Sequence, residues 1–210
     1  MSGVGSNTSA TGGYIVPTAP PAPSEDEFLA AIQGQIAALS RLPGALVRPR
    51  WQPMAPAQPD AMVTWGAVGI TMVEADEYPM FRHVGDTVLP GETNPGYSII
   101  RRNLTLTVTV SFYGPGADEC AGLVRDGLYV PQNYEPLASL GLKLLTVHDL
   151  ARAPELINQQ WINRVDLRLE YRTQLERTLP IFDLAGADVD LISETAEAPV
   201  TVRPDTVLRP

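Results

Sequence analysis

Histidines and the cysteine of this chain could do chemistry, but their spacing argues against it. The two histidines, His83 and His148, lie far apart and have neither an HxxxH nor an HxxE spacing, so neither indicates a metal site. The single cysteine, Cys120, lies in an apolar stretch with a helical pattern, which favours a small buried thiol over a nucleophile. One cysteine also excludes a disulfide within the chain.

The acidic and glycine-rich clusters lack the spacing of known binding loops. Glu74, Asp76 and Glu77 lie close together, but a calcium loop needs regularly spaced ligands and a glycine. The stretch 114–122 (GPGADECAG) matches neither phosphate-loop pattern, GxxxxGK[ST] or GxGxxG, and the chain has no GxSxG nucleophile elbow. The sequence therefore predicts no catalytic residue, no metal ligand and no cofactor, in a protein that is not an enzyme.

Charged side chains form one regular pattern, in the stretch Pro154–Arg172 (PELINQQWINRVDLRLEYR). From position 161 onward the residue types alternate, which is the period of a half-buried strand. We expect the buried face to carry Trp161, Asn163, Val165, Leu167, Leu169 and Tyr171. The opposite face carries the candidate subunit-interface residues Arg164, Asp166, Arg168, Glu170 and Arg172. Such a row is typical of a solvated sheet face or of a surface that meets copies of the same chain, and the sequence leaves both open.

Three helices are predicted along the chain. The first begins at Ser24, where Ser24 and Glu27 match a capping box, and is closed by Pro43–Gly44. The second covers Ala117–Leu128, and a shorter helical stretch covers Gln132–Leu140. None of them lies between two strands in the manner of a βαβ repeat.

The predicted strands are mostly half-buried and alternating. They cover Leu46–Trp51, Ala61–Val73, Arg101–Tyr113, Leu142–Val147 and the long strand within Pro154–Leu179. Pro49 confines the first of these to a sheet edge or to an irregular start. Loops are predicted at Gln52–Asp60 and, unusually long, at Glu74–Ile100. This order predicts an α+β fold, with an antiparallel or mixed β-sheet and helices packed on one face.

Composition and charge limit what the arms, the surface and the location of the protein can be. Residues 1–23 predict an extended N-terminal arm, residues 24–183 an α+β domain, and residues 184–210 an acidic C-terminal arm. The net charge of −9 argues against capture of nucleic acid by charge. No apolar run is long enough to span a membrane, and the N-terminus has no signal-peptide pattern. We therefore expect the protein in the cytoplasm or in a particle assembled there.

Four stretches carry a resemblance to a known family. They are RLPGALVRPRWQP (Arg41–Pro53), SFYGPGA (Ser111–Ala117), LVRDGLYVPQN (Leu123–Asn133) and the stretch Pro154–Arg172 quoted above. In order and spacing the chain resembles, over roughly residues 24–180, the phage neck or tail terminator family of long-tailed bacteriophages. Both arms lie outside the resemblance.

The resemblance implies a structural part of the virion with no active site. It implies a ring, usually a hexamer, that caps the finished tail tube and stops tube polymerisation. Such a ring also docks the tail to the head connector or adaptor protein. It implies the tail tube protein and the sheath protein as neighbours, and DNA that passes through the lumen without sequence-specific binding. The protein would then be assembled in the host cytoplasm and reside at the head–tail junction, where both arms could fold onto neighbours.

Two other classes of function remain open from the sequence. Another tail or head-completion protein, associated with the tube or the sheath, would share the composition, but a tube protein would polymerise into long cylinders. A stand-alone binding module would remain a monomer and capture a ligand. A measured mass in solution separates a closed ring from both.

Overall fold

The chain divides into two compact units. The computed structural model describes residues 7–11, 13–17, 23–52, 54, 57–85, 96–157 and 159–183. One unit comprises Met1–Val16, His83–Ser98 and Leu179–Pro210, and the other comprises Pro17–Arg82 and Ile99–Thr178. The second unit contains the helices and most of the sheet, and we call it the sheet unit.

The first helix, α1, spans Glu25–Ser40 and begins where the sequence predicts. The Ser24 hydroxyl accepts a hydrogen bond from the Glu27 backbone N–H at 3.2 Å, and the Glu27 carboxylate accepts one from the Ser24 N–H at 2.6 Å. This confirms the capping box. The helix ends at Arg41, whose φ of 59° is left-handed. Two further helices follow, α2 at Ala117–Gly127 and α3 at Glu135–Ala138, the latter preceded by a short 3₁₀ turn at Pro131–Asn133.

The main sheet is mixed, one of the two arrangements that the sequence allows, and has the strand order β1-β2-β4-β9-β5. These strands are β1 (Val47–Pro49), β2 (Trp65–Ala75), β4 (Tyr97–Tyr113), β9 (Arg164–Leu179) and β5 (Lys143–Val147). β1 runs parallel to β2, whereas β2 pairs with β4, and β5 with β9, in antiparallel fashion. β1 is an edge strand, which is one of the two alternatives predicted from Pro49.

Three short additions complete the sheets. β3 (Met80–Val84) pairs with β4, and β6 (Ala151–Arg152) pairs with β9. A separate hairpin is formed by β7 (Glu155–Ile157) and β8 (Gln160–Ile162), with Gln159 at a φ of 64° in its turn.

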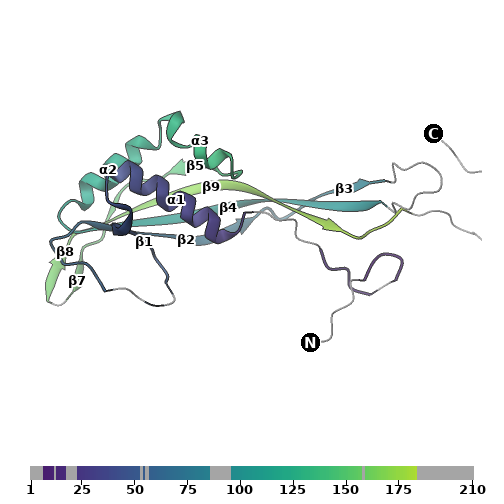
Figure 1. The fold of residues 1–210 in the computed structure, drawn as a ribbon, viewed down its shortest axis with the longest axis horizontal. Coiled ribbons are helices and arrows are strands. Elements are labelled where there is room, and N and C mark those ends of the chain that lie inside the picture. The colour runs from purple at the N-terminus through teal and green to yellow at the C-terminus, as the bar shows by residue number, and fades with distance from the viewer. Residues whose placement is uncertain are drawn as a thin grey trace, which may run out of the picture. The chain divides into compact units, whose positions relative to one another are not determined.

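Within the sheet unit the helices lie on one face of the sheet (Figure 1). Alternate residues of β4 and β9 point to that face and are buried, among them Val108, Val110, Phe112, Val165, Leu167, Leu169 and Tyr171. They form one apolar cluster with Ile32 and Ile36 of α1 and with the α2 residues Cys120 and Val124. The Tyr171 hydroxyl donates to Gln35 of α1 at 2.9 Å, so the one polar atom of this buried ring has a partner. The predicted fold class and the buried Cys120 thiol are both confirmed.

The prediction of one long loop at Glu74–Ile100 is wrong. β2 continues to Ala75, β3 occupies Met80–Val84, and β4 already begins at Tyr97. β3 is exposed along most of its length, so it shows no alternation that a sequence pattern could reveal. Its strand conformation comes from backbone pairing with β4, which side-chain types do not encode. Residues 86–95 lie outside the described residues.

Trp161 does not lie on the buried face. Its side chain is 72% exposed, whereas the neighbouring Ile162 is buried. The predicted single strand is two elements, because Asn163 separates β8 from β9 and its carbonyl accepts a hydrogen bond from the Gly114 N–H at 3.0 Å. From Val165 onward the predicted alternation is correct, and Leu167 is fully buried.

None of the helices in the described residues has the length and apolar content needed to cross a membrane.

Candidate interface on the helix-free sheet face

The five candidate interface residues lie on the face of the sheet that the helices leave uncovered. They alternate along β9 with buried residues that point to the helices. On the neighbouring strands the same face carries Ser111 and Tyr113 of β4 and their register partners on β2, Ala67 and Trp65. We call this surface the helix-free face.

Arg164 forms the centre of an ion-pair network on this face. Its guanidinium donates to both carboxylate oxygens of Asp166, at 2.8 and 2.9 Å, and also to Glu155 in β7. Its carbon Cζ lies 5.7 Å from the centre of the Tyr113 ring. The side chain is only 19% exposed. The hydrogen bonds to Asp166 raise the pKa of Arg164 despite its burial, so it stays charged.

The network continues from Asp166 across the sheet to the chain segment after β1. Ser111, which is fully buried, donates its hydroxyl hydrogen to Asp166 at 2.5 Å and accepts a hydrogen bond from Arg50. Three stretches that are far apart in sequence, at Arg50, at Ser111 and from Glu155 to Asp166, are therefore linked through polar side chains. A sequence pattern could not identify Arg50, Ser111 or Glu155 as members, because the sheet topology alone brings them together.

The other half of the charged row also finds partners within the chain. Arg172 donates to both carboxylate oxygens of Asp76, at 2.8 and 3.0 Å. A hydrogen bond from Asn103 at 3.0 Å is the main cause that lowers the pKa of Asp76, and the nearby Arg172 charge also lowers it. Glu170 accepts from His148 at 2.9 Å and contacts Arg168 only at 3.4 Å.

The three arginines of the row therefore differ in their freedom to bind a partner. Arg164 is held by a bidentate pair and Arg172 by two hydrogen bonds from one nitrogen, whereas Arg168 is 48% exposed and its side chain has one long contact among the described residues. If the row meets another subunit, Arg168 is the member with the most unused donor capacity. Pairing across a subunit boundary stays a prediction for all five residues.

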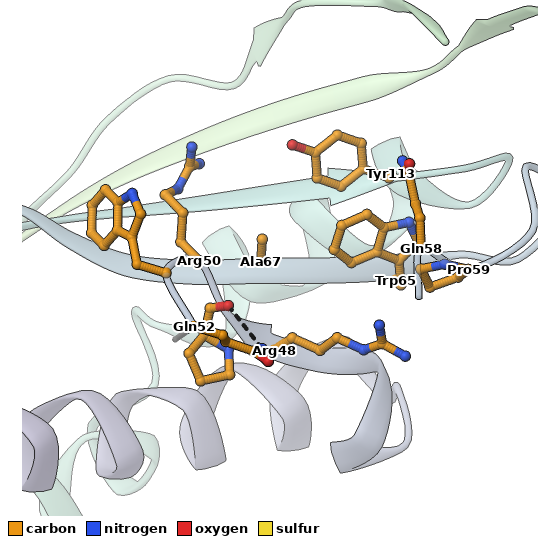
Figure 2. Close-up of a pocket in the computed structure, with 10 residues that line it drawn as sticks. Arg48, Arg50, Gln52, Gln58, Pro59, Trp65, Ala67 and Tyr113 are labelled. Atoms are coloured by element: carbon orange, nitrogen blue, oxygen red, sulfur yellow. Dashed lines mark hydrogen bonds between the residues drawn. The ribbon is translucent and has the colours of Figure 1, made fainter. Parts of the chain in front are cut away.

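An aromatic groove borders the network at the β1 edge of the helix-free face (Figure 2). The Trp65 and Tyr113 rings stack with centres 4.4 Å apart and planes 11° from parallel. Ala67 lies between this stack and Arg50 (Figure 2), and Arg48 and Trp51 also line the groove. The groove encloses about 410 Å³. The sequence analysis did not identify this groove, since its walls come from three separate stretches of the chain.

In the other unit, a serine, a histidine and an aspartate are connected in the order of a nucleophilic triad. His83 Nδ1 lies 2.9 Å from Ser98 Oγ, and His83 Nε2 contacts Asp183. Ser98 is only 7% exposed, so its hydroxyl is not presented to a substrate. His83, expected in a loop, lies in β3. The described residues contain no group of three or more His, Cys, Asp or Glu side chains that could hold a metal ion.

The Asp118 carboxylate links α2 to the start of the charged row through hydrogen bonds. The stability that these bonds contribute should depend on pH. Asn163 donates to its carboxylate at 2.7 Å and Arg152 at 2.8 Å, and these hydrogen bonds lower the pKa of Asp118 below 3.8. A lowered folded-state pKa stabilises the fold above the unfolded value, and this contribution is lost as pH falls through the folded value. Asp118→Asn should therefore destabilise the protein at about pH 6, by less than about 1 kcal/mol because the site is exposed, and the loss should shrink as the pH is lowered towards about 2. Urea unfolding at both pH values tests this, and a loss of the same size at both would contradict it.

A comparison with protein families identifies one relationship. A family model described as a phage neck terminator protein matches residues 26–201. The match includes all three helices, the main sheet and the helix-free face. No curated protein matches the chain.

Proposed function

The chain belongs to the phage neck terminator family, and we propose that it forms a homo-hexameric ring that caps the tail tube, stops its polymerisation and joins it to the head connector. The family is structural, so the protein is a structural component of the phage neck. In the proposed ring the tube protein, the sheath protein and the head connector or adaptor are neighbours, and DNA passes through the lumen. The main support for this proposal is the helix-free face, where charges of both signs alternate on a half-buried strand.

Exposed apolar side chains in the sheet unit support association with other proteins. Large apolar residues are exposed on β2, on β3 and in the turn between them, namely Met72, Val73, Tyr78, Met80 and Phe81. Exposed large apolar side chains that gather in one stretch of a chain are commonly found at interfaces. We infer that this stretch contacts either a second subunit or the tail tube.

Reversing the charge of Arg168 tests the ring. In the proposed assembly Arg168 pairs with an acidic residue of the adjacent subunit, because among the described residues its side chain makes only the long 3.4 Å contact with Glu170. Arg168→Glu should replace that attraction by repulsion and shift the protein from a ring near six subunits towards monomer. The mass is measured by light scattering behind a sizing column, alone and with tube protein added.

A matched control is Arg125→Glu, which changes a similarly exposed arginine of α2 whose partner is the adjacent Asp126. This variant should keep the wild-type mass. An unchanged mass for Arg168→Glu would remove Arg168 from the interface, whereas a wild-type protein that stays monomeric with tube and connector proteins would overturn the proposed function. Long cylinders in place of a closed ring would identify a tube protein.

A further inference from the structure

The groove beside the Trp65–Tyr113 stack has the chemistry of a site for an acidic and apolar peptide. Of the described residues that line it, three are aromatic and two are arginine, and none is acidic. In a chain whose net charge is −9, such a pocket attracts carboxylates while its rings accept apolar side chains.

The two arginines have no ion-pair partner among the described residues. Arg48 donates to two backbone carbonyls, those of Ala45 at 3.2 Å and Ala57 at 2.9 Å. Arg50 donates to Ser111, but its Nε is buried and has no acceptor within the part of the chain that the structure describes. An unpaired buried donor is costly, so the Arg50 guanidinium, which lines the groove, has donor capacity left for a carboxylate.

The shape of the groove depends on two small residues of β2. At Gly69 a Cβ would lie 2.8 Å from a Trp51 ring carbon and 2.9 Å from Arg50 Cβ. The absence of a side chain there lets the segment after β1 lie directly on β2, where the Arg50 N–H donates to the Val68 carbonyl at 2.7 Å. Ala67 then separates Arg50 from the Trp65–Tyr113 pair (Figure 2).

We propose that this groove binds the acidic segment 184–199 of a second copy of the chain. That segment (LAGADVDLISETAEAP) has four carboxylates, Asp188, Asp190, Glu194 and Glu197, and no arginine or lysine. Its Asp-Val-Asp-Leu run places acids and apolar residues on opposite sides when extended, which matches arginines and rings in one groove. Residues 1–23, by contrast, contain no charged side chain.

The occupant is a second copy because the groove adjoins the helix-free face. Tyr113 lines the groove and also contacts Arg164, and Arg50 joins the groove to Ser111 and Asp166. A segment of the adjacent subunit seated here would extend the proposed interface without a break. The inference rests on the proposed ring, since the ring brings copies together at high effective concentration.

Photo-crosslinking in the full chain tests the proposal. Gln58→p-benzoylphenylalanine places a photoreactive group on an exposed residue that lines the groove, and Tyr129→p-benzoylphenylalanine is the control at an exposed site elsewhere. Isotope-labelled and unlabelled copies are mixed, irradiated and analysed by mass spectrometry. The Gln58 variant should crosslink residues 184–199 of another copy, and the Tyr129 variant should not. Replacing the four acids together by Asn or Gln should reduce the yield about tenfold.

Light scattering on the same samples separates the two proposals. A ring whose groove crosslinks only its own copy, residues 1–23 or nothing overturns this inference and leaves the ring intact. A wild-type chain that stays monomeric overturns both. Crosslinks to 184–199 that persist after neutralisation of the four acids would show that charge does not select the segment, and would also overturn the inference.

Discussion

Leu167→Ala should destabilise the protein by about 2–5 kcal/mol, the range for a leucine removed from a packed core. Leu167 is fully buried in the cluster formed by β4, β9, α1 and α2. Removing its isobutyl group takes away apolar contacts and leaves a cavity that rigid helices and strands cannot fill. The loss is measured by urea unfolding, as a lower midpoint with an unchanged slope.

Trp161→Ala is the informative control for this change. The sequence pattern places Trp161 and Leu167 on the same buried face, whereas in the structure Trp161 is 72% exposed. Its replacement should change the free energy of unfolding by less than about 0.5 kcal/mol, as for other exposed sites. Comparable losses for the two variants would mean that the strand is continuous through Asn163, and would contradict the break seen between β8 and β9.

Features that depend on neighbours in sequence could be predicted well. The capping box of α1 needs only Ser24 and Glu27, and the edge position of β1 follows from the missing N–H of Pro49. The alternation along β4 and most of β9 reports directly which side chains face the core. In each case one local property determines the local structure.

Features that depend on distant residues could not be predicted. β3 is a strand because β4 lies beside it, and its own side chains are mostly exposed. The partners of the charged row show the same limit, since Arg172 pairs with Asp76 from a different strand. The sequence correctly places these five charges on one face, but the pairing of each charge depends on the order of strands in the sheet.

The sequence leaves open whether the charged row is a solvated face or an interface. The pairings within the chain show that its arginines do not all fit the same one of these two alternatives. A solvated row would leave its arginines exposed, yet Arg164 is largely buried by its own neighbours, and only Arg168 extends well into solvent. The row therefore combines two roles in one strand. The end near Arg164 organises the face, and Arg168 is the residue that we propose for contact with another subunit.

Arg164→Ala should separate these roles by destabilising the monomer. The change removes the bidentate pair with Asp166 and the bond to Glu155, and leaves Asp166 partly buried without its cation. Breaking a fully buried pair costs about 3–5 kcal/mol, and with the remaining exposure of these side chains we expect about 2–3 kcal/mol. Chemical unfolding of the isolated protein measures the loss.

Arg168→Ala provides the contrast, because its loss should change the free energy of unfolding by less than about 0.5 kcal/mol. Its effect should instead appear as weaker assembly at equal monomer stability. If Arg164→Ala leaves stability unchanged, the network on the helix-free face does not hold β7 and β9 together, and Arg164 becomes a candidate for contact between subunits. If both variants lower stability equally, the distinction between an organising and a contacting arginine fails.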